Sequence, residues 1–379
     1  MGEYCFLFRA TQSARTRGSV GLAFGSGRGD DTLTPSQPGR RAAESARRVA
    51  RSPFFPVWPA TALLFAVSPL IDPGSLNASA LTSTLPFAAL LAIAAMGQTL
   101  VIQQRGLDLS VPGMISLATI LITKYPNQLD SRLPEGLALV ALACVLSGAL
   151  SGFAVTKLRI TPLVATLGVN AILLGTILQV TNGTSTAAPP PALVSFAFGK
   201  TGGIPNTAIV AAVLACIVAA LFRATAAGRR FVAVGTNAPA AFVAGIPTNA
   251  YVFATYILAS LFYGVAAILL AGYVGTPGLS AGNNYLLPSI TAVVLGGASL
   301  AGGSGSVIGT AVGALFLIQL QQDVFGAGAP SSVQYLIQAG VIALAMTLRT
   351  ARVGRISSAL LRRTSRPVPI PSPTASDPS

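Results

Sequence analysis

An aspartate stands between two apolar stretches of the sequence, in the segment AMGQTLVIQQRGLDLSVPG at residues 95–113. Glycine and proline around Asp108 weaken a helix, and the side chains of Asp108 and Ser110 can hydrogen-bond the backbone groups that are freed. The segment therefore predicts a helix break, with a cap for the helix that follows. The alternative is a carboxylate that lines or gates a polar path, because ionisable groups in apolar segments usually face a polar cavity.

A second segment, GRRFVAVGTNAPAAFVAGIP at residues 228–247, joins two apolar stretches and begins with a pair of arginines. Asn237 is of a residue type that caps helices. The small residues of the run AAFVAG give a helix a smooth surface, which can dock into a groove of a partner protein. A helix that merely lies at an interface explains the same pattern, so both interpretations stay open.

A third segment, LGGASLAGGSGSVIGTAVGAL at residues 295–315, is rich in glycine. It does not match a phosphate-binding loop, because no Lys-Ser or Lys-Thr follows the glycines and no strand precedes them. The spacing of Gly309 and Gly313 instead predicts close packing between two helices. Gly296 and Gly297 are candidates for a helix break or for the lining of a path.

Polar residues inside the apolar segments are candidates for contact with a transported solute. They are Gln98, Asn170, Gln179 and Asn284, beside Asp108 and Ser110. Each serves equally well as a hydrogen bond between helices, because buried amides commonly bond neighbouring helices.

The whole chain has the composition of a protein that is solvated by lipid. Of its 379 residues, 52% are hydrophobic and 9% are charged, and its mean hydropathy is +0.69. A soluble domain carries about a quarter charged residues. Because the apolar stretches are continuous and rich in small residues, without the alternation of a barrel, we predict an all-α, polytopic bundle of transmembrane helices.

Ten apolar segments are candidates for membrane spans. They cover residues 55–71, 81–104, 109–124, 136–156, 161–181, 207–222, 250–272, 286–300, 304–322 and 331–348. Several are shorter than the roughly 20 residues that a straight span needs, which suits a transporter. We expect the short segment 286–300 to be tilted or locally broken while still crossing the membrane.

The net charge of +14 is concentrated near the two ends of the chain, with nine arginines before residue 52 and six between Arg349 and Arg366. By the positive-inside rule both termini are cytoplasmic, and ten crossings also place the basic loop 223–249 inside. We interpret these clusters as determinants of topology beside membrane lipid, in preference to a nucleic-acid site. The loop 182–206, which has three successive prolines, is then external.

Three regions follow from this pattern. Residues 1–52 are a basic cytoplasmic tail that is expected to be disordered, and whether they belong to the natural protein stays open. Residues 53–349 are the transmembrane domain. Residues 350–379 are a second cytoplasmic tail, first basic and then rich in proline and serine.

Residues suited to catalysis are scarce. The chain has no histidine, its ten acidic residues are scattered, and its three cysteines have no disulfide or metal spacing. We therefore predict no catalytic, cofactor or metal site, and a protein that is not an enzyme. A transporter working alone needs ion-coupling residues within the membrane, for which only Asp108, and Asp323 near a span end, qualify.

The order of the three segments resembles one family. GQTLVI and GLDLSVPG, then G-x-N-x-x-AA-x-x-x-GI, then AVVLGGASLAGGSGSVIGT are similar to the ribose-type ABC importer permeases, which are related to branched-chain amino-acid permeases. The resemblance runs from about residue 55 to 348. It implies a permease in the bacterial inner membrane that moves a small polar solute, by preference a monosaccharide, with a branched-chain amino acid as the alternative.

The resemblance also implies partners: an ATPase subunit that binds ATP and Mg, a periplasmic or lipid-anchored solute-binding protein, and a second permease copy or homologue. In such importers a short cytoplasmic helix sits in a cleft of the ATPase. The residues that match it here are Gly235, Asn237, Ala240, Ala241, Gly245 and Ile246. The sequence departs from the family pattern at Arg105, Pro112 and Phe242, and at Leu286 and Pro288, where many sugar permeases carry acidic residues.

Overall fold

The computed structural model describes residues 54–184, 187–330, 332–341, 343 and 347. All of these belong to the second of two compact units, residues 48–379. The predicted tails, 1–52 and 350–379, lie outside the described residues.

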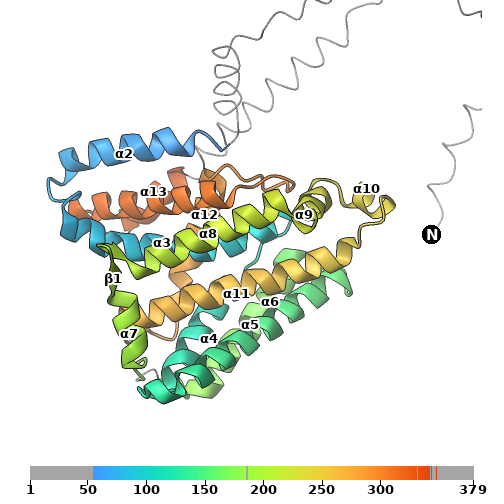
Figure 1. Cartoon of the computed structure of the whole chain (residues 1–379), viewed down its shortest axis with the longest axis horizontal. Coiled ribbons are helices and arrows are strands. Elements are labelled where there is room, and N and C mark those ends of the chain that lie inside the picture. Colours follow the sequence, from blue (N-terminus) through green and yellow to red (C-terminus); the bar gives the residue numbers. More distant parts are fainter. Residues whose placement is uncertain (1–53, 185–186, 331, 342, 344–346, 348–379) are drawn as a thin grey trace, which may run out of the picture. The chain divides into compact units, whose positions relative to one another are not determined.

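The described part of the chain is almost entirely helical, which confirms the predicted fold class (Figure 1). The long helices are α2 (Val57–Ile71), α3 (Ala78–Gln103), α4 (Val111–Lys124), α5 (Leu133–Thr156), α6 (Pro162–Thr181), α8 (Asn206–Ala224), α11 (Thr248–Val274) and α13 (Val307–Gly326). The shorter helices are η1 (Asp130–Arg132), α7 (Pro191–Phe198), α9 (Ala226–Thr236), α10 (Ala238–Val243), η2 (Ala281–Tyr285) and α12 (Leu286–Leu295). Strands β1 (Lys200–Thr201) and β2 (Ile204–Pro205) form a two-residue antiparallel hairpin.

Helix α3 lies at the centre of the bundle. In its most apolar stretch 89% of the residues are buried, against 28% for α6 and 22% for α8. Helix α3 packs against α8, α11, α12 and α13 (Figure 1). The even distribution of apolar residues around α3 fits this position, because a helix that is hydrophobic on all sides is buried.

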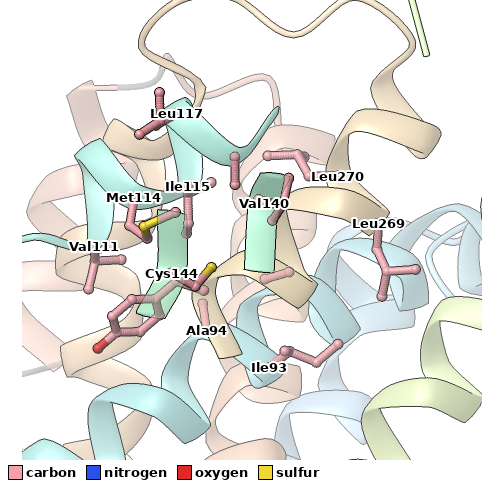
Figure 2. Close-up of a cluster of buried hydrophobic side chains, with 14 of the residues drawn as sticks. Ile93, Ala94, Val111, Met114, Ile115, Leu117, Val140, Cys144, Leu269 and Leu270 are labelled. Carbon is pink, nitrogen blue, oxygen red and sulfur yellow. The ribbon is translucent and has the colours of Figure 1, made fainter. Parts of the chain in front are cut away.

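The main hydrophobic core joins α3, α4, α5 and α11, as Figure 2 shows. Met114 and Ile115 of α4 are fully buried there, beside Val140 and Cys144 of α5. Small residues allow the helices to approach: a Cβ atom on Gly148 of α5 would lie 2.7 Å from the carbonyl oxygen of Tyr256 in α11. Helix packing in a membrane depends on such close approach, because lipid offers no hydrophobic drive to associate.

Two long helices are each followed by an irregular segment and a short helix. Helix α3 leads through residues 104–110 into α4, which has 14 residues, and α11 leads through residues 275–285 into α12, which has 10 residues. At 1.5 Å per residue, these short helices measure about 21 and 15 Å. Neither reaches across a hydrocarbon core of about 30 Å.

The irregular segment before α12 contacts the beginning of α4 inside the bundle. The backbone N–H of Gly282 in η2 donates a 2.9 Å hydrogen bond to Oγ of Ser116 in α4. Gly282 also packs directly on the carbonyl of Pro112, where no side chain would fit. The beginning of α4 and the segment before α12 therefore form one contact, which residues 95–113 alone did not predict.

Each of the ten segments predicted as spans contains helix. Six helices are long and apolar enough to cross a membrane: α3, α6, α8, α11, α13 and the stretch Asp130–Thr156 that includes α5. The local break predicted in segment 286–300 is found, because α12 ends at Leu295. The number of ten crossings and the location of both termini stay predictions.

Candidate functional site

The Asp108 carboxylate is buried, with 1% of the residue exposed, in the irregular segment between α3 and α4. Its Oδ1 atom accepts hydrogen bonds from the Ser110 backbone N–H, at 2.9 Å, and from the Ser110 hydroxyl, at 2.6 Å. Asp108 thus fixes Ser110, the residue that precedes α4, but it accepts no hydrogen bond from the amides in the first turn of α4. The predicted break is present, and its cap comes from a different helix.

Asn170 of α6 supplies that cap. Its Oδ1 atom accepts a 2.8 Å hydrogen bond from the backbone N–H of Gly113, in the first turn of α4. Thr166, one helical turn earlier in α6, accepts a 2.9 Å bond from the Leu109 N–H. Of the two interpretations of Asn170, the structure shows the hydrogen bond between helices.

Gln98 in the centre of α3 is fully buried. Its Oε1 atom accepts a 3.0 Å hydrogen bond from the Tyr263 hydroxyl of α11. The same hydroxyl approaches the Asp108 carboxylate. Gln98 and Asp108 therefore belong to one polar contact between the two long helices, while the Gln98 Nε2 atom has no partner among the described residues.

The residues after α3 bind the end of α9. The Arg105 backbone is left-handed, with φ of 64°. Its Nε atom donates a 3.0 Å hydrogen bond to the Gly235 carbonyl, and its guanidinium also donates to the Thr236 carbonyl. Nε2 of Gln104 donates a 2.9 Å bond to the Phe231 carbonyl. A cation beside the unpaired carbonyls of a helix C-terminus is favourable for charge and hydrogen bonding alike.

The glycine-rich segment joins the same junction. The Gly303 N–H donates a 2.9 Å hydrogen bond to the carbonyl of Gln103, the last residue of α3. The predicted close packing is confirmed at Gly313, where a Cβ would lie 2.5 Å from the Ala292 carbonyl of α12. Gly296 packs against α13 in the same way, and Gly297 occupies a left-handed turn with φ of 88°.

Helix α10 is held by caps at both ends. Oδ1 of Asn237 accepts a 3.0 Å hydrogen bond from the Ala240 N–H. At the other end Gly245 is left-handed, with φ of 81°, and donates to the Phe242 carbonyl, while Ile246 donates to the Ala241 carbonyl. This pair of bonds is a Schellman motif. The spacing G-x-N-x-x-AA-x-x-x-GI is therefore explained by the capping of a six-residue helix.

The two most exposed apolar side chains of α10 are those that the motif does not include. Ala241 is 5% exposed, whereas Phe242 and Val243 are 69% and 88% exposed. Gly235 is buried against the Gln103 carbonyl. The surface that α10 offers is thus built by Phe242 and Val243, and the matched residues shape and hold the helix beneath it.

A cavity of about 580 Å³ opens at the other end of the bundle, among α3, α11, η2, α12 and α13. Its polar lining includes Ser83, Thr84, Asn284, Gln321, Gln322 and Gln334, and its aromatic lining comprises Phe87, Tyr285 and Phe325. None of the described residues that line it carries a charge. Of the polar residues named from the sequence, Asn284 lies in this cavity, and Gln98, Asp108, Ser110 and Asn170 do not.

Comparison with known proteins places this arrangement in a family. Residues 80–346 match the family described as branched-chain amino acid transport system / permease component. The chain belongs to this permease family. It is also similar to the autoinducer 2 import system permease protein LsrD of Escherichia coli (strain K12) and of Shigella flexneri. With each it shares 32% identity over 285 residues, which are 73% of this chain and 86% of the relative. No solved structure matches the chain.

The protein is therefore a permease subunit of an ABC importer, a transport component with several membrane-spanning helices. The family match begins at residue 80, near the start of α3, so α2 precedes it. Helix α2 is nevertheless tied to the permease by a buried contact, in which the Ser68 hydroxyl donates a 2.7 Å hydrogen bond to Asp323 of α13.

Sequence reasoning did not find two elements of the permease. Helix α9 was not predicted, because its arginines and glycines do not form an apolar repeat, although Thr225 before it is a usable capping residue. The contact of Arg105 with α9 was also not predicted, because its partners are backbone carbonyls 130 and 131 residues away. The one available signal was an arginine where the family often has glycine.

Proposed function

We propose that this permease imports a small uncharged polar solute, of the monosaccharide class, across the bacterial inner membrane, and that ATP is hydrolysed on a partner ATPase that docks on α10. The observation that carries the proposal is the exposed apolar pair Phe242 and Val243, on a capped helix whose neighbour α9 is bound by Arg105. An exposed apolar pair on a rigid helix is typical of a docking surface.

Charge supports an orientation with α9 and α10 in the cytoplasm. Arg223 lies in the last turn of α8, and Arg229 and Arg230 lie in α9. Lys157 and Arg159 follow α5, whose Gly152 packs on Phe253 near the start of α11. The opposite end, with α7 and the hairpin, has Asp72, Asp130, Glu135 and Asp323 beside Lys124, Arg132 and Lys200. An excess of positive charge marks the cytoplasmic side. The cavity then faces the side from which a solute-binding protein delivers its solute.

The hydrogen bonds of Arg105 suggest how docking is transmitted. Helix α10 follows α9 directly, and α9 ends at the carbonyls that Arg105 and Gln104 bind. These residues connect α3 to the segment that contains Asp108 and leads into α4. A movement imposed on α10 is thus passed to the broken region within the bundle by polar contacts that have definite geometry.

The solute class rests on two observations. The similar proteins are named for import of autoinducer 2, and the cavity is lined by uncharged groups. A branched-chain amino acid, which the family description names, carries an ammonium and a carboxylate. Desolvating these groups without charged partners is costly, so the cavity favours the uncharged solute.

The proposal is tested in proteoliposomes that contain the permease, its ATPase and its solute-binding protein. Val243→Ser and Phe242→Ala should each lower ATP-driven uptake of labelled D-ribose and solute-stimulated ATP hydrolysis by about tenfold, because removing a buried apolar side chain costs about 1.5–3 kcal/mol at an interface. Val232→Ser is the control, since Val232 is a 41% exposed valine on α9.

Uptake and ATP hydrolysis that stay normal in both α10 variants would refute the docking assignment. Uptake of labelled L-leucine in place of D-ribose by the unaltered complex would refute the solute class. Ala241 and Gly245 are poorer test positions, because Ala241 is buried and Gly245 has a left-handed backbone.

A further inference from the structure

Four carboxamide side chains line the cavity. None of the side chains of Asn284, Gln321, Gln322 and Gln334 forms a hydrogen bond with another described residue. Elsewhere in the bundle the amides of Gln98, Asn170 and Gln319 are bonded to neighbouring helices. A carboxamide supplies both donors and an acceptor. The cavity therefore concentrates polar groups that are free to bind something else.

Two of the three glutamines of α13, Gln321 and Gln322, line the cavity because of the rotation of the helix. Ile318, Gln321, Gln322 and Phe325 all line the cavity, at the spacing i, i+3, i+4 and i+7 that forms one helical face. On the other face Asp323 is 1% exposed and accepts hydrogen bonds from Ser68, at 2.7 Å, and from Gln319, at 2.9 Å. The bonds of Ser68 with Asp323 and with Gln319 join α2 to α13, so they fix the rotation of α13 and hold Gln321 and Gln322 in place.

One side of the cavity is formed by η2, which contacts the beginning of α4. Asn284 and Tyr285 belong to η2, and Gly282 of the same turn is bonded to Ser116 of α4. A molecule in the cavity therefore touches η2, the segment that leads from α11 into α12 and packs on α4. Leu91 and Leu270 give the cavity apolar walls, from α3 and α11.

We propose that this cavity is a solute-binding subsite of the permease, and that it takes a small, uncharged, polyhydroxylated molecule. The inference rests on the proposed function and adds the residues that would bind the solute: Asn284, Gln321 and Gln322, with Phe87, Tyr285 and Phe325 as apolar faces. A hydroxyl group both donates and accepts hydrogen bonds, as the carboxamides do. Aromatic rings beside a few convergent polar groups are typical of small-molecule sites, and the volume lies within their usual range of about 300–1,000 Å³.

Matched substitutions test the subsite in the complete complex of permease, ATPase and solute-binding protein. Asn284→Ala and Gln321→Leu should each raise the KM for uptake of labelled D-ribose by about two- to tenfold, which is the range for the loss of one hydrogen bond. Asn283→Ala is the control, because Asn283 is exposed and does not line the cavity.

A labelling experiment tests the same site without transport. In a permease with Cys216→Ser, the variant Gln322→Cys is treated with a membrane-impermeant maleimide, in the complex and without ATP. We expect D-ribose to slow the labelling several-fold, and L-leucine at the same concentration to leave it unchanged. The variant Asn283→Cys should be labelled at the same rate with and without either solute.

The two proposals fail in different ways. If the unaltered complex takes up D-ribose with ATP, but Asn284→Ala and Gln321→Leu behave like Asn283→Ala and D-ribose gives no protection, the subsite is refuted and the proposed function stands. If the unaltered complex takes up no D-ribose and D-ribose gives no protection, both are refuted. Protection by L-leucine alone would overturn the uncharged class of ligand.

Discussion

The guanidinium of Arg105 donates a hydrogen bond of 3.0 Å from Nε to the carbonyl oxygen of Gly235. This bond joins the end of α3 to the end of α9, across 130 positions of sequence. Because α9 continues into α10, the proposed docking helix is bonded through its neighbour to the segment that precedes α4. These bonds give α9 and α10 a defined structural connection to the helices of the membrane domain.

The first prediction concerns this contact. Arg105→Ala should lower the stimulation of ATP hydrolysis by solute about fivefold or more, which is the lower end of measured couplings between sites. Arg159→Ala is a matched control, since Arg159 also has a left-handed backbone, with φ of 56°, and has no contact with α9. Arg105→Gly should behave like Arg105→Ala, although glycine relieves the backbone strain. Normal stimulation in both variants would rule out a coupling role.

The second prediction separates the two interpretations of Asp108. Asp108→Asn keeps an acceptor for Ser110 and removes the charge, so uptake should stay within about threefold of the unaltered permease if Asp108 only holds Ser110 at the helix break. Asp108→Ala leaves the Ser110 N–H and hydroxyl without a partner and should lower the free energy of unfolding by about 1–3 kcal/mol. Uptake is measured in proteoliposomes and stability by thermal unfolding in detergent. A stable Asp108→Asn permease without uptake would favour a role in the translocation path.

The third prediction concerns helix packing. Gly148→Ala forces a methyl group against the backbone of α11 and should destabilise the permease by about 1–3 kcal/mol. Gly175→Ala in α6 is the control, because no atom lies within 4 Å of the added Cβ. The control should be neutral or stabilising by up to about 1 kcal/mol, since alanine favours helix. Unfolding midpoints in one detergent compare the two, and equal midpoints would contradict the close approach of α5 and α11.

The fourth prediction concerns the attachment of α2. Asp323→Ala removes the carboxylate that accepts from Ser68 and Gln319, which leaves Ser68 the Leu64 carbonyl and Gln319 the Ser68 oxygen, and should cost about 1–2 kcal/mol. Glu135→Ala is the control, because Glu135 is exposed at the start of α5. Gln321 and Gln322 line the cavity because of the rotation of α13, and the bond of Asp323 with Ser68 holds that rotation. Asp323→Ala should therefore also raise the KM for D-ribose. A permease that is destabilised but keeps its KM would show that α2 does not position the cavity.

Much of the membrane domain could be predicted from local sequence. Helix appears in every apolar segment because backbone groups in lipid must bond within their own segment. Two helix boundaries were also predicted from the sequence. Asn237 caps the start of α10, and the helix break around Asp108 is present. The spacing of Gly309 and Gly313 indicated the packing of α13 on α12.

The functional contacts could not be predicted in the same way. Gln98, Asn170 and Asn284 are all amides within apolar segments, yet two of them bond neighbouring helices and only Asn284 lines the cavity. Gln321 and Gln322 gave no signal, because the apolar pattern of α13 does not reveal which face meets α2. The difference depends on distant partners such as Ser68.

The sequence by itself determined the class of protein, its helices, its caps and its family, since these depend on composition and on neighbours within a few residues. The tertiary structure alone decided that the beginning of α4 meets η2, that Arg105 binds α9, and that carboxamides from η2 and α13 without partners among the described residues share one cavity. The physical reason is that a hydrogen bond to a distant backbone carbonyl, or the rotation of a helix against its neighbour, depends on residues far away in the sequence and produces no local sequence pattern.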